Sequence, residues 1–378
     1  MARHYLDHAS TSPTRPVALD AMRDWYASAG ATGDPGRIHA EGMTARVAVE
    51  QAREDVAACF GARSREVVFT SSATESITAA VWGAAPRGSQ FVVPAVEHSA
   101  VREAAAMLAE LGTHEVVPVA VDGLGRVDPD DVVAAITPDT ALVNVQWANH
   151  EVGTRQPVAE IVAACRERDV LVHVDAAVGA GHDVVEMGAL GADLVSISGH
   201  KFGAPPGIGV LLIRRGLRIR PLLRGGDQER ARRAGLENVP AIVGLAAVCR
   251  ELDRADIAAE AAAARRSTDR VLALADSIDG VRVYGDRIDR APHLVCLGID
   301  GVEPQAVLLG LDQRGIAAHS GSACSSEALE PSPVLEAMGV DAHRSLRVST
   351  GWTTTDADVD ALAEALPEVV GRLRALAS

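Results

Sequence analysis

The stretch SISGHKFGAPPGIGV, residues 196–210, contains Lys201, the only lysine of the chain. The chain has 36 Lys and Arg residues, so the other 35 are arginines. Arginine binds carboxylates and phosphates at least as well as lysine, but its guanidinium stays protonated and cannot act as an amine nucleophile. The single retained amine therefore indicates chemistry on a carbonyl group.

Cys324 is a second candidate nucleophile. It lies in SGSACSS, residues 320–326, where small and polar neighbours give the thiol little to pack against. The other four of the five cysteines lie in apolar contexts, and no CxxC pair is present, so neither a disulfide framework nor a zinc site is predicted. An inert surface cysteine is the alternative interpretation of Cys324.

The elements that must position these groups follow an alternating pattern. Short runs rich in valine, such as EVVFT (66–70) and VLVHVDA (170–176), alternate with helical patterns over roughly residues 15–240. Such a pattern is typical of a mostly parallel sheet that is covered by helices on both faces. The sequence therefore predicts an α/β fold.

Polar side chains follow five of these predicted strands. In sheets of this kind, ligands bind at the carboxyl ends of the strands. Each residue alone is explained by a cap or a turn, but together they indicate a site. They are Ser72, Ala73, Thr74, Glu97, His98, Asn149, His150, Asp175, Ser198, His200 and Lys201.

Two of these segments have alternative interpretations. TSSATES, residues 70–76, suits a phosphate at a helix N-terminus and suits a simple N-cap equally well. His173 and Asp175 alternate onto one face of their strand, but no third ligand lies at a useful spacing, so no metal site is predicted.

The rest of the chain predicts a second, smaller unit. A long Ala-rich helix is expected over about residues 239–277, followed by the strands HLVCLGI and SLRVS and a closing helix from about Asp356. We expect a large domain over residues 15–250. Residues 1–14 and 251–378 would form a small α+β domain that carries the Cys324 segment.

Six motifs in order resemble the cysteine desulfurases, which belong to the class V branch of the fold-type I pyridoxal-phosphate enzymes. They are VEHSAV, HVDA, SGHK, the Gly-Pro turn that follows it, GGDQER and SGSACSS. The resemblance covers almost the whole chain. It implies a fold-type I transferase with a mostly parallel, seven-stranded central sheet.

The resemblance also implies roles for individual residues. Lys201 would carry the pyridoxal 5'-phosphate covalently, Asp175 would pair with its ring nitrogen, and His98 would stack on the ring and assist proton transfer. Arg347 and His150 would bind the substrate, and Cys324 would take its sulfur as a persulfide. The implied cofactor-binding residues are Lys201, Asp175, His98, Ser72, Ala73, Thr74, His150, Val178, Ser198 and His200.

Four residues depart from the family pattern, and they surround the expected cofactor. Val178 replaces a glutamine that donates to the phenolic oxygen, and His150 replaces an asparagine. Leu236 replaces a threonine that reaches the phosphate of the neighbouring subunit, and Ser72 replaces a glycine. Since an imidazole can donate a hydrogen bond, His150 is expected to compensate in part for Val178.

The sequence thus predicts a homodimeric cysteine desulfurase that converts L-cysteine to L-alanine and passes the sulfur to an acceptor protein. The alternatives are another class V enzyme, such as a selenocysteine or cysteine lyase or an aminotransferase, and a cofactor-poor scaffold or sulfur relay. The net charge of −15 argues against direct nucleic-acid binding. The longest apolar stretch is far below the ~20 residues of a membrane helix, so a cytoplasmic protein without membrane contact is expected.

Overall fold

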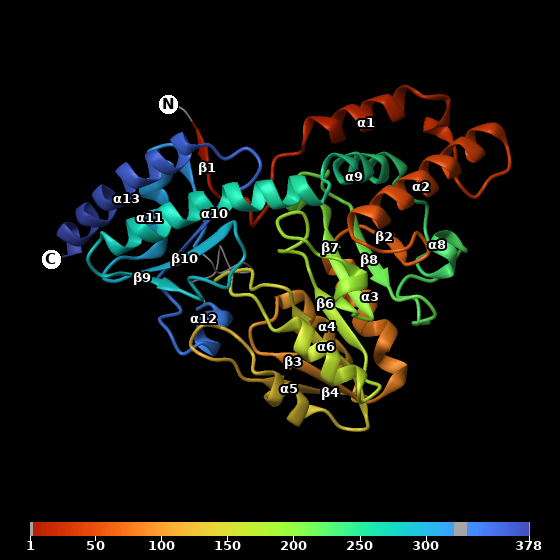
Figure 1. The fold of residues 1–378 in the computed structure, drawn as a ribbon, viewed down its shortest axis with the longest axis horizontal. Helices are drawn as coiled ribbons and strands as arrows, with labels where there is room; N and C mark the ends of the chain where they lie inside the picture. The colour runs from red at the N-terminus through yellow and green to blue at the C-terminus, as the bar shows by residue number, and fades with distance from the viewer. Residues whose placement is uncertain (1–2, 321–330, 378) are drawn as a thin grey trace.

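A computed structural model describes residues 3–320 and 331–377. Its centre is a seven-stranded sheet with the strand order β2-β8-β7-β6-β5-β3-β4 (Figure 1). Strand β8 runs antiparallel to β2 and β7, and the other neighbouring strands of this sheet pair in parallel. The strands are β2 (Val67–Thr70), β3 (Gln90–Pro94), β4 (Glu115–Val119), β5 (Thr140–Gln146), β6 (Val172–Asp175), β7 (Leu194–Ser198) and β8 (Gly209–Ile213). The predicted mostly parallel, seven-stranded α/β sheet is confirmed.

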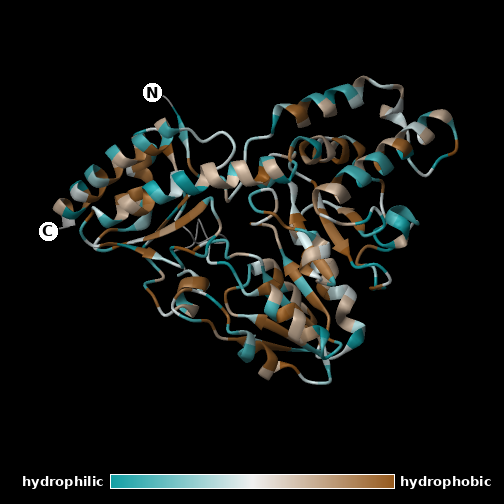
Figure 2. Ribbon diagram, viewed as in Figure 1, coloured by the Kyte–Doolittle hydropathy of each residue, from teal (hydrophilic) through white to brown (hydrophobic). Residues whose placement is uncertain are grey.

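Helices cover both faces of this sheet because nearly every strand residue is apolar. Alternate residues of one strand enter different cores: Val67 and Phe69 belong to one cluster, and Val68 belongs to the other. The brown strands beneath two-coloured helices in Figure 2 show this layering. The helices and turns of this part are α1 (Pro16–Ala27), η1 (Ala29–Thr32), α2 (Ala40–Cys59), α3 (Ala73–Ala84), η2 (Ala85–Arg87), α4 (Ser99–Glu110), α5 (Pro129–Ala135), α6 (Val158–Arg166), α7 (Met187–Leu190), η3 (Gly199–Phe202), α8 (Gln228–Ala231) and α9 (Val239–Glu251).

A second sheet of three antiparallel strands, in the order β12-β10-β9, has its own apolar core. The N-terminal segment joins it, since β1 pairs in parallel with β11 and Leu6 enters that core. The elements are β1 (His4–Tyr5), α10 (Arg254–Asp276), β9 (Val281–Tyr284), β10 (Leu294–Ile299), α11 (Pro304–Asp312), β11 (Ile316–Ala317), α12 (Pro333–Ala337), β12 (Ser345–Ser349) and α13 (Asp356–Ala377). The exact domain limits at 14/15 and 250/251 stay a prediction.

The single long helix expected over residues 239–277 is wrong. Helix α9 ends at Glu251, and Asp253 begins α10 with a capping box. The Asp253 carboxylate accepts from the N–H groups of Ala255 and Asp256, at 2.7 and 2.9 Å, while Asp256 accepts from the Asp253 N–H at 3.3 Å. These bonds satisfy N–H groups that a continuous helix would pair internally, so they stabilise the break.

Within the described part of the chain, no helix combines the length and the apolar character needed to cross a bilayer.

Candidate active site

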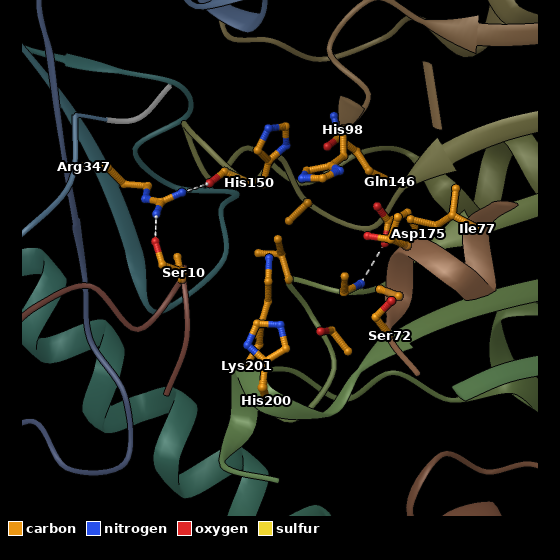
Figure 3. Close-up of a pocket in the computed structure, with 17 residues that line it drawn as sticks. Ser10, Ser72, Ile77, His98, Gln146, His150, Asp175, His200, Lys201 and Arg347 are labelled. Atoms are coloured by element: carbon orange, nitrogen blue, oxygen red, sulfur yellow. Dashed lines mark hydrogen bonds between the residues drawn. The ribbon is translucent and has the colours of Figure 1, made fainter. Parts of the chain in front are cut away.

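A cavity of about 270 Å³ lies at the carboxyl ends of β5, β6 and β7. Most of the predicted site residues that the structure describes line it, although they come from segments as distant as β2–α3 and β12, whereas Glu97 and Asn149 are buried and do not line it. The lining residues among them are Ser72, Ala73, Thr74, His98, His150, Asp175, Val178, Ser198, His200, Lys201 and Arg347 (Figure 3). Cys324, the remaining predicted site residue, lies outside the described residues.

One end of the cavity is the N-terminus of α3. Ser72 is the N-cap, and its hydroxyl accepts from the N–H of Glu75 at 3.2 Å, while Glu75 accepts from the N–H of Ser71 at 2.8 Å. The N-cap interpretation of this segment is therefore correct. It does not exclude an anion, because the first N–H groups of a helix have no partner within the helix and favour negative charge.

Gly209 allows strand β8 to lie close to the backbone at the start of α3. A Cβ atom at this position would lie 2.5 Å from the carbonyl carbon of Ser72. Strand β8 and the Ser72 backbone can therefore pack against each other only because residue 209 has no side chain.

Asp175 closes the cavity at the end of β6. Its carboxylate accepts from the N–H of Ala177 at 2.9 Å, and its side chain is buried. Burial raises the pKa of Asp175, whereas the Ala177 N–H and the charge of Lys201 act against this shift. These partners favour the ionised carboxylate.

Glu97 lies fully buried near Asp175. It accepts from the N–H of Gln146 at 2.7 Å, and its other oxygen has no partner among the described residues. Burial, and then the charge of Asp175, raise the pKa of Glu97 well above its usual value. Since two close buried carboxyl groups rarely ionise together, this shift favours the neutral form of Glu97 beside Asp175.

His98 caps the N-terminus of α4. Its Nδ1 accepts from the N–H of Ala100 at 3.1 Å, so the neutral ring carries its hydrogen on Nε2. Burial, followed by the electrostatic effects of His150, Lys201 and Arg102, lowers the pKa of His98 to about 3. The imidazole is therefore neutral, and it contacts the ring of His150 edge to face with centroids 4.8 Å apart.

Arg347 on β12 forms the wall opposite Asp175 (Figure 3). Its Nη1 donates to the carbonyl of His150 at 2.9 Å, and its Nη2 donates to Asp7 at 3.0 Å and to Ser10 at 2.7 Å. The buried Nε–H has no partner among the described residues. This donor is suited to a carboxylate ligand.

Lys201 belongs to the η3 turn that follows β7. Two side chains hold its backbone: the Ser12 hydroxyl donates to the Lys201 carbonyl at 2.7 Å, and His182 Nε2 lies 2.9 Å from the same oxygen. In Figure 3 the Lys201 side chain lies between Arg347 on one side and Asp175 on the other. The sole amine and the predicted ring-nitrogen partner therefore share one cavity.

Sequence reasoning missed several residues that line the same cavity, among them Ser10 and Gln146. Gln146 ends β5 beside Asp175 of β6, so the strand-end rule could have found it. Ser10 reaches the cavity through the N-terminal segment, and no local pattern indicates that placement. His173, which was considered as a metal ligand, lies buried between Asn144 and Ser196 at 3.0 and 2.8 Å.

The residues fit pyridoxal phosphate as a group. The helix start suits its phosphate, the buried Asp175 suits a protonated ring nitrogen, and Lys201 suits its aldehyde. The wall near the expected phenolic oxygen fits the cofactor less well, because Val178 belongs to an apolar cluster with Ala9 and Ala148 and cannot donate a hydrogen bond.

Comparisons with known proteins identify the family of the chain. The family model of the class-V aminotransferases matches residues 4–362. A cysteine desulfurase of Trichormus azollae is 42% identical over 383 residues, which cover 98% of this chain and 94% of the relative. A solved NifS-like protein superposes with a TM-score of 0.91 at 30% identity, covering 98% of this chain and 100% of the other. The structure of SspA in complex with cysteine has a TM-score of 0.82 at 26% identity, covering 93% and 100%.

Proposed function

The chain belongs to the class-V aminotransferase family and, within it, to the cysteine desulfurases, and we propose that Cys324 is the thiol that takes the sulfur of L-cysteine. The enzyme depends on pyridoxal phosphate. When bound, this cofactor supplies an electron-withdrawing ring that is conjugated to the α-carbon of the amino acid. The single observation that supports desulfurase chemistry in this cavity is that Lys201 and Asp175 both line it.

The chain's own residues take separate tasks. Lys201 would hold the cofactor and move the proton at the substrate α-carbon. Neutral His98 would stack on the ring and hold a proton at Nε2, since its Nδ1 is bound to the backbone of Ala100. Arg347 would bind the substrate carboxylate, and Ser72, Thr74, Ser198 and His200 would surround the phosphate.

The ends of the segment that contains Cys324 support its role. Before the segment, the carbonyl of Ser320 accepts from the hydroxyl of Ser345 on β12, the strand that carries Arg347. After it, the Ser332 hydroxyl donates to Glu151, whose neighbour in the chain is His150. Both ends are therefore bound to elements that form the cavity.

The transfer step balances without a further reactant. The thiolate of Cys324 attacks the sulfur of cysteine, so an S–S bond forms and the C–S bond breaks. The electron pair of the broken bond stays on the substrate, which takes up protons and leaves as L-alanine. The product on the protein is a Cys324 persulfide.

A homodimer is part of the proposal. Helices α1 and α2 and the segment around α8 lie at one end of the molecule (Figure 1), and exposed apolar side chains occur on them and just before α2. They are Tyr26, Ile38, Met43, Val47, Leu223 and Leu236, with Ile38 exposed to 93%. Exposed apolar side chains that form a patch mark protein interfaces.

The sulfur acceptor and a cytoplasmic location also stay proposals.

The decisive experiment incubates the cofactor-loaded protein with L-cysteine and assays alanine and the mass of the Cys324 peptide. We expect stoichiometric alanine and a gain of one sulfur atom on Cys324. Lys201→Ala should abolish the visible band of the bound cofactor, whereas Cys324→Ser should keep the band and lose the persulfide. A colourless protein that ignores added cofactor would favour the scaffold alternative, and full turnover by Cys324→Ser would favour a lyase.

A further inference from the structure

Glu151 lies between two side chains with different functions. Its side chain is buried, and its Oε2 accepts from the hydroxyl of Ser332, the N-cap of α12, at 2.5 Å. Its Oε1 lies 3.6 Å from Nε2 of His150, the residue before it in the chain. This distance is longer than a hydrogen bond, but it makes Nε2 the ring nitrogen that lies toward the carboxyl group of Glu151.

The imidazole of His150 is held on the wall of the active-site cavity. Only 5% of the residue is exposed, and its ring contacts His98 edge to face. Its Nδ1 has no hydrogen-bond partner among the described residues. Glu151 is therefore the acceptor that the described structure places beside this ring.

We propose that Glu151 is a positioning residue for His150, and that it fixes the hydrogen of the neutral imidazole on Nε2 and leaves Nδ1 as the acceptor of the ring. A carboxylate only accepts hydrogen bonds, so the nitrogen that faces it must carry the hydrogen. A neutral imidazole has one donor and one acceptor, and the partner of one nitrogen decides the state of the other. This role of Glu151 adds to the proposed function. Only its effect on the kinetics depends on that function.

The groups around His150 keep its ring neutral, so the position of its single N–H hydrogen decides which nitrogen can accept a hydrogen bond. His98 and Arg102 face it from α4, Lys201 from η3 and Arg347 from β12. Burial, followed by the charges of Lys201, Arg347 and Arg102, lowers the pKa of His150 well below its usual value. Glu151 is the carboxylate that opposes this cationic surrounding.

This tautomer determines which ligand groups His150 can bind. An unprotonated Nδ1 accepts from an ammonium, a thiol or an N–H group, and it cannot donate to an oxygen. With this tautomer His150 would not replace the lost donor at Val178, so the same measurement also tests that expectation. Instead, His150 favours a substrate that offers a donor at this wall, as the ammonium and thiol groups of an amino thiol do.

The tautomer can be measured directly on the cofactor-loaded protein by ¹⁵N nuclear magnetic resonance of its histidine side chains. The chain has 12 histidines, so His150→Asn identifies the signal by its loss. We expect the Nε2–H pattern for His150 from pH 6 to pH 8. A hydrogen on Nδ1 would overturn the proposal.

Two variants separate the positioning role from a structural one. Glu151→Gln keeps an oxygen for Ser332 but loses the carboxylate, so His150 should shift toward a mixture of tautomers. Ser332→Ala removes the hydroxyl that donates to Oε2 of Glu151 and should leave the His150 signal unchanged. Equal shifts in both variants, or no shift in Glu151→Gln, would overturn the proposal.

Steady-state kinetics with L-cysteine provides the second measurement. Glu151→Gln should lower kcat/KM about tenfold, which is the effect of losing one hydrogen bond between the substrate and Nδ1 of His150. It should also change the pH profile of kcat/KM. Ser332→Ala should keep the shape of that profile, and a profile unchanged by Glu151→Gln would contradict the kinetic part. A protein without desulfurase activity that still shows the expected tautomers would refute the proposed function and support the assignment of Glu151.

Discussion

Arg347 on β12 donates through Nη2 to the carboxylate of Asp7 at 3.0 Å, which joins the N-terminal segment to the wall of the active-site cavity. Ser10 accepts from the same nitrogen at 2.7 Å. The guanidinium is thus oriented before a substrate arrives, and its Nε–H remains without a partner among the described residues. Such preorganisation reduces the ordering cost of binding a carboxylate.

Arg347→Lys should therefore weaken substrate binding even though the charge is kept. An ammonium cannot reproduce the planar fork of a guanidinium, and hydrogen bonds to charged groups are worth about 1.5–3 kcal/mol each. We expect KM for L-cysteine to rise about tenfold to a hundredfold, with a smaller change in kcat. Ser10→Ala is the matched control and should raise KM by less, because it loses one neutral partner. An unchanged KM in Arg347→Lys would place the carboxylate elsewhere.

The strand-end residues of the site could be predicted from the sequence because their positions depend on local patterns. Buried valine-rich runs predicted β6 and β7, and the rule that parallel strands end at one edge placed Asp175 and Lys201 together. The partners of Arg347 could not be predicted in this way. Asp7 and Ser10 reach it through a pairing between β1 and β11 that no local periodicity indicates.

The break between α9 and α10 was visible in the sequence but was missed. Asp253 and Asp256 have the spacing of a capping box, yet their alanine-rich surroundings favour a continuous helix. The hydrogen bond from Ser332 to Glu151 was not predictable from spacing, since the two residues are distant in sequence. Local signals thus predicted elements, and tertiary contacts determined which side chains meet.

Gly209→Ala should impair cofactor binding without touching the cofactor. The new Cβ would lie 2.5 Å from the Ser72 carbonyl carbon, and backbone atoms on both sides cannot move aside cheaply. Overpacking of this kind costs about 1–3 kcal/mol, so we expect the Kd for pyridoxal phosphate to rise about tenfold to a hundredfold. Titration of the cofactor-free protein, followed by visible absorbance, measures this.

Gly123→Ala is the control for that substitution, because its Cβ would meet no atom within 4 Å. It should bind the cofactor as the unmodified protein does. If Gly209→Ala binds equally well, the start of α3 is not the phosphate site.

Buried histidines predict an acid-sensitive fold. Burial lowers the pKa of His173 to about 3, and the ring lies within hydrogen-bond distance of Asn144 and Ser196. Because the unfolded chain takes up this proton below about pH 6.5 and the folded chain does not, the free energy of unfolding should fall as the pH decreases from 6.5 toward 3.

One such histidine changes the free energy of unfolding by at most about 1.4 kcal/mol per pH unit. Urea unfolding at pH 7, 6 and 5 should therefore show a smaller decrease for His173→Asn than for the unmodified protein. Both should show the same dependence between pH 7.5 and 8.5, where the imidazole is neutral in either state. Parallel curves down to pH 5 would mean that His173 is protonated in the folded protein.

Val178→Gln should restore a donor that the resemblance predicts at this wall. Val178 is 5% exposed and packs with Ala9 and Ala148, so nothing on this wall donates to the expected phenolic oxygen. A hydrogen bond to a charged oxygen is worth about 1.5–3 kcal/mol, so the amide should lower the cofactor's Kd about tenfold or more. Val178→Leu controls for the added volume and should not tighten binding. If Val178→Gln and Val178→Leu release the cofactor at equal rates, residue 178 does not face that oxygen.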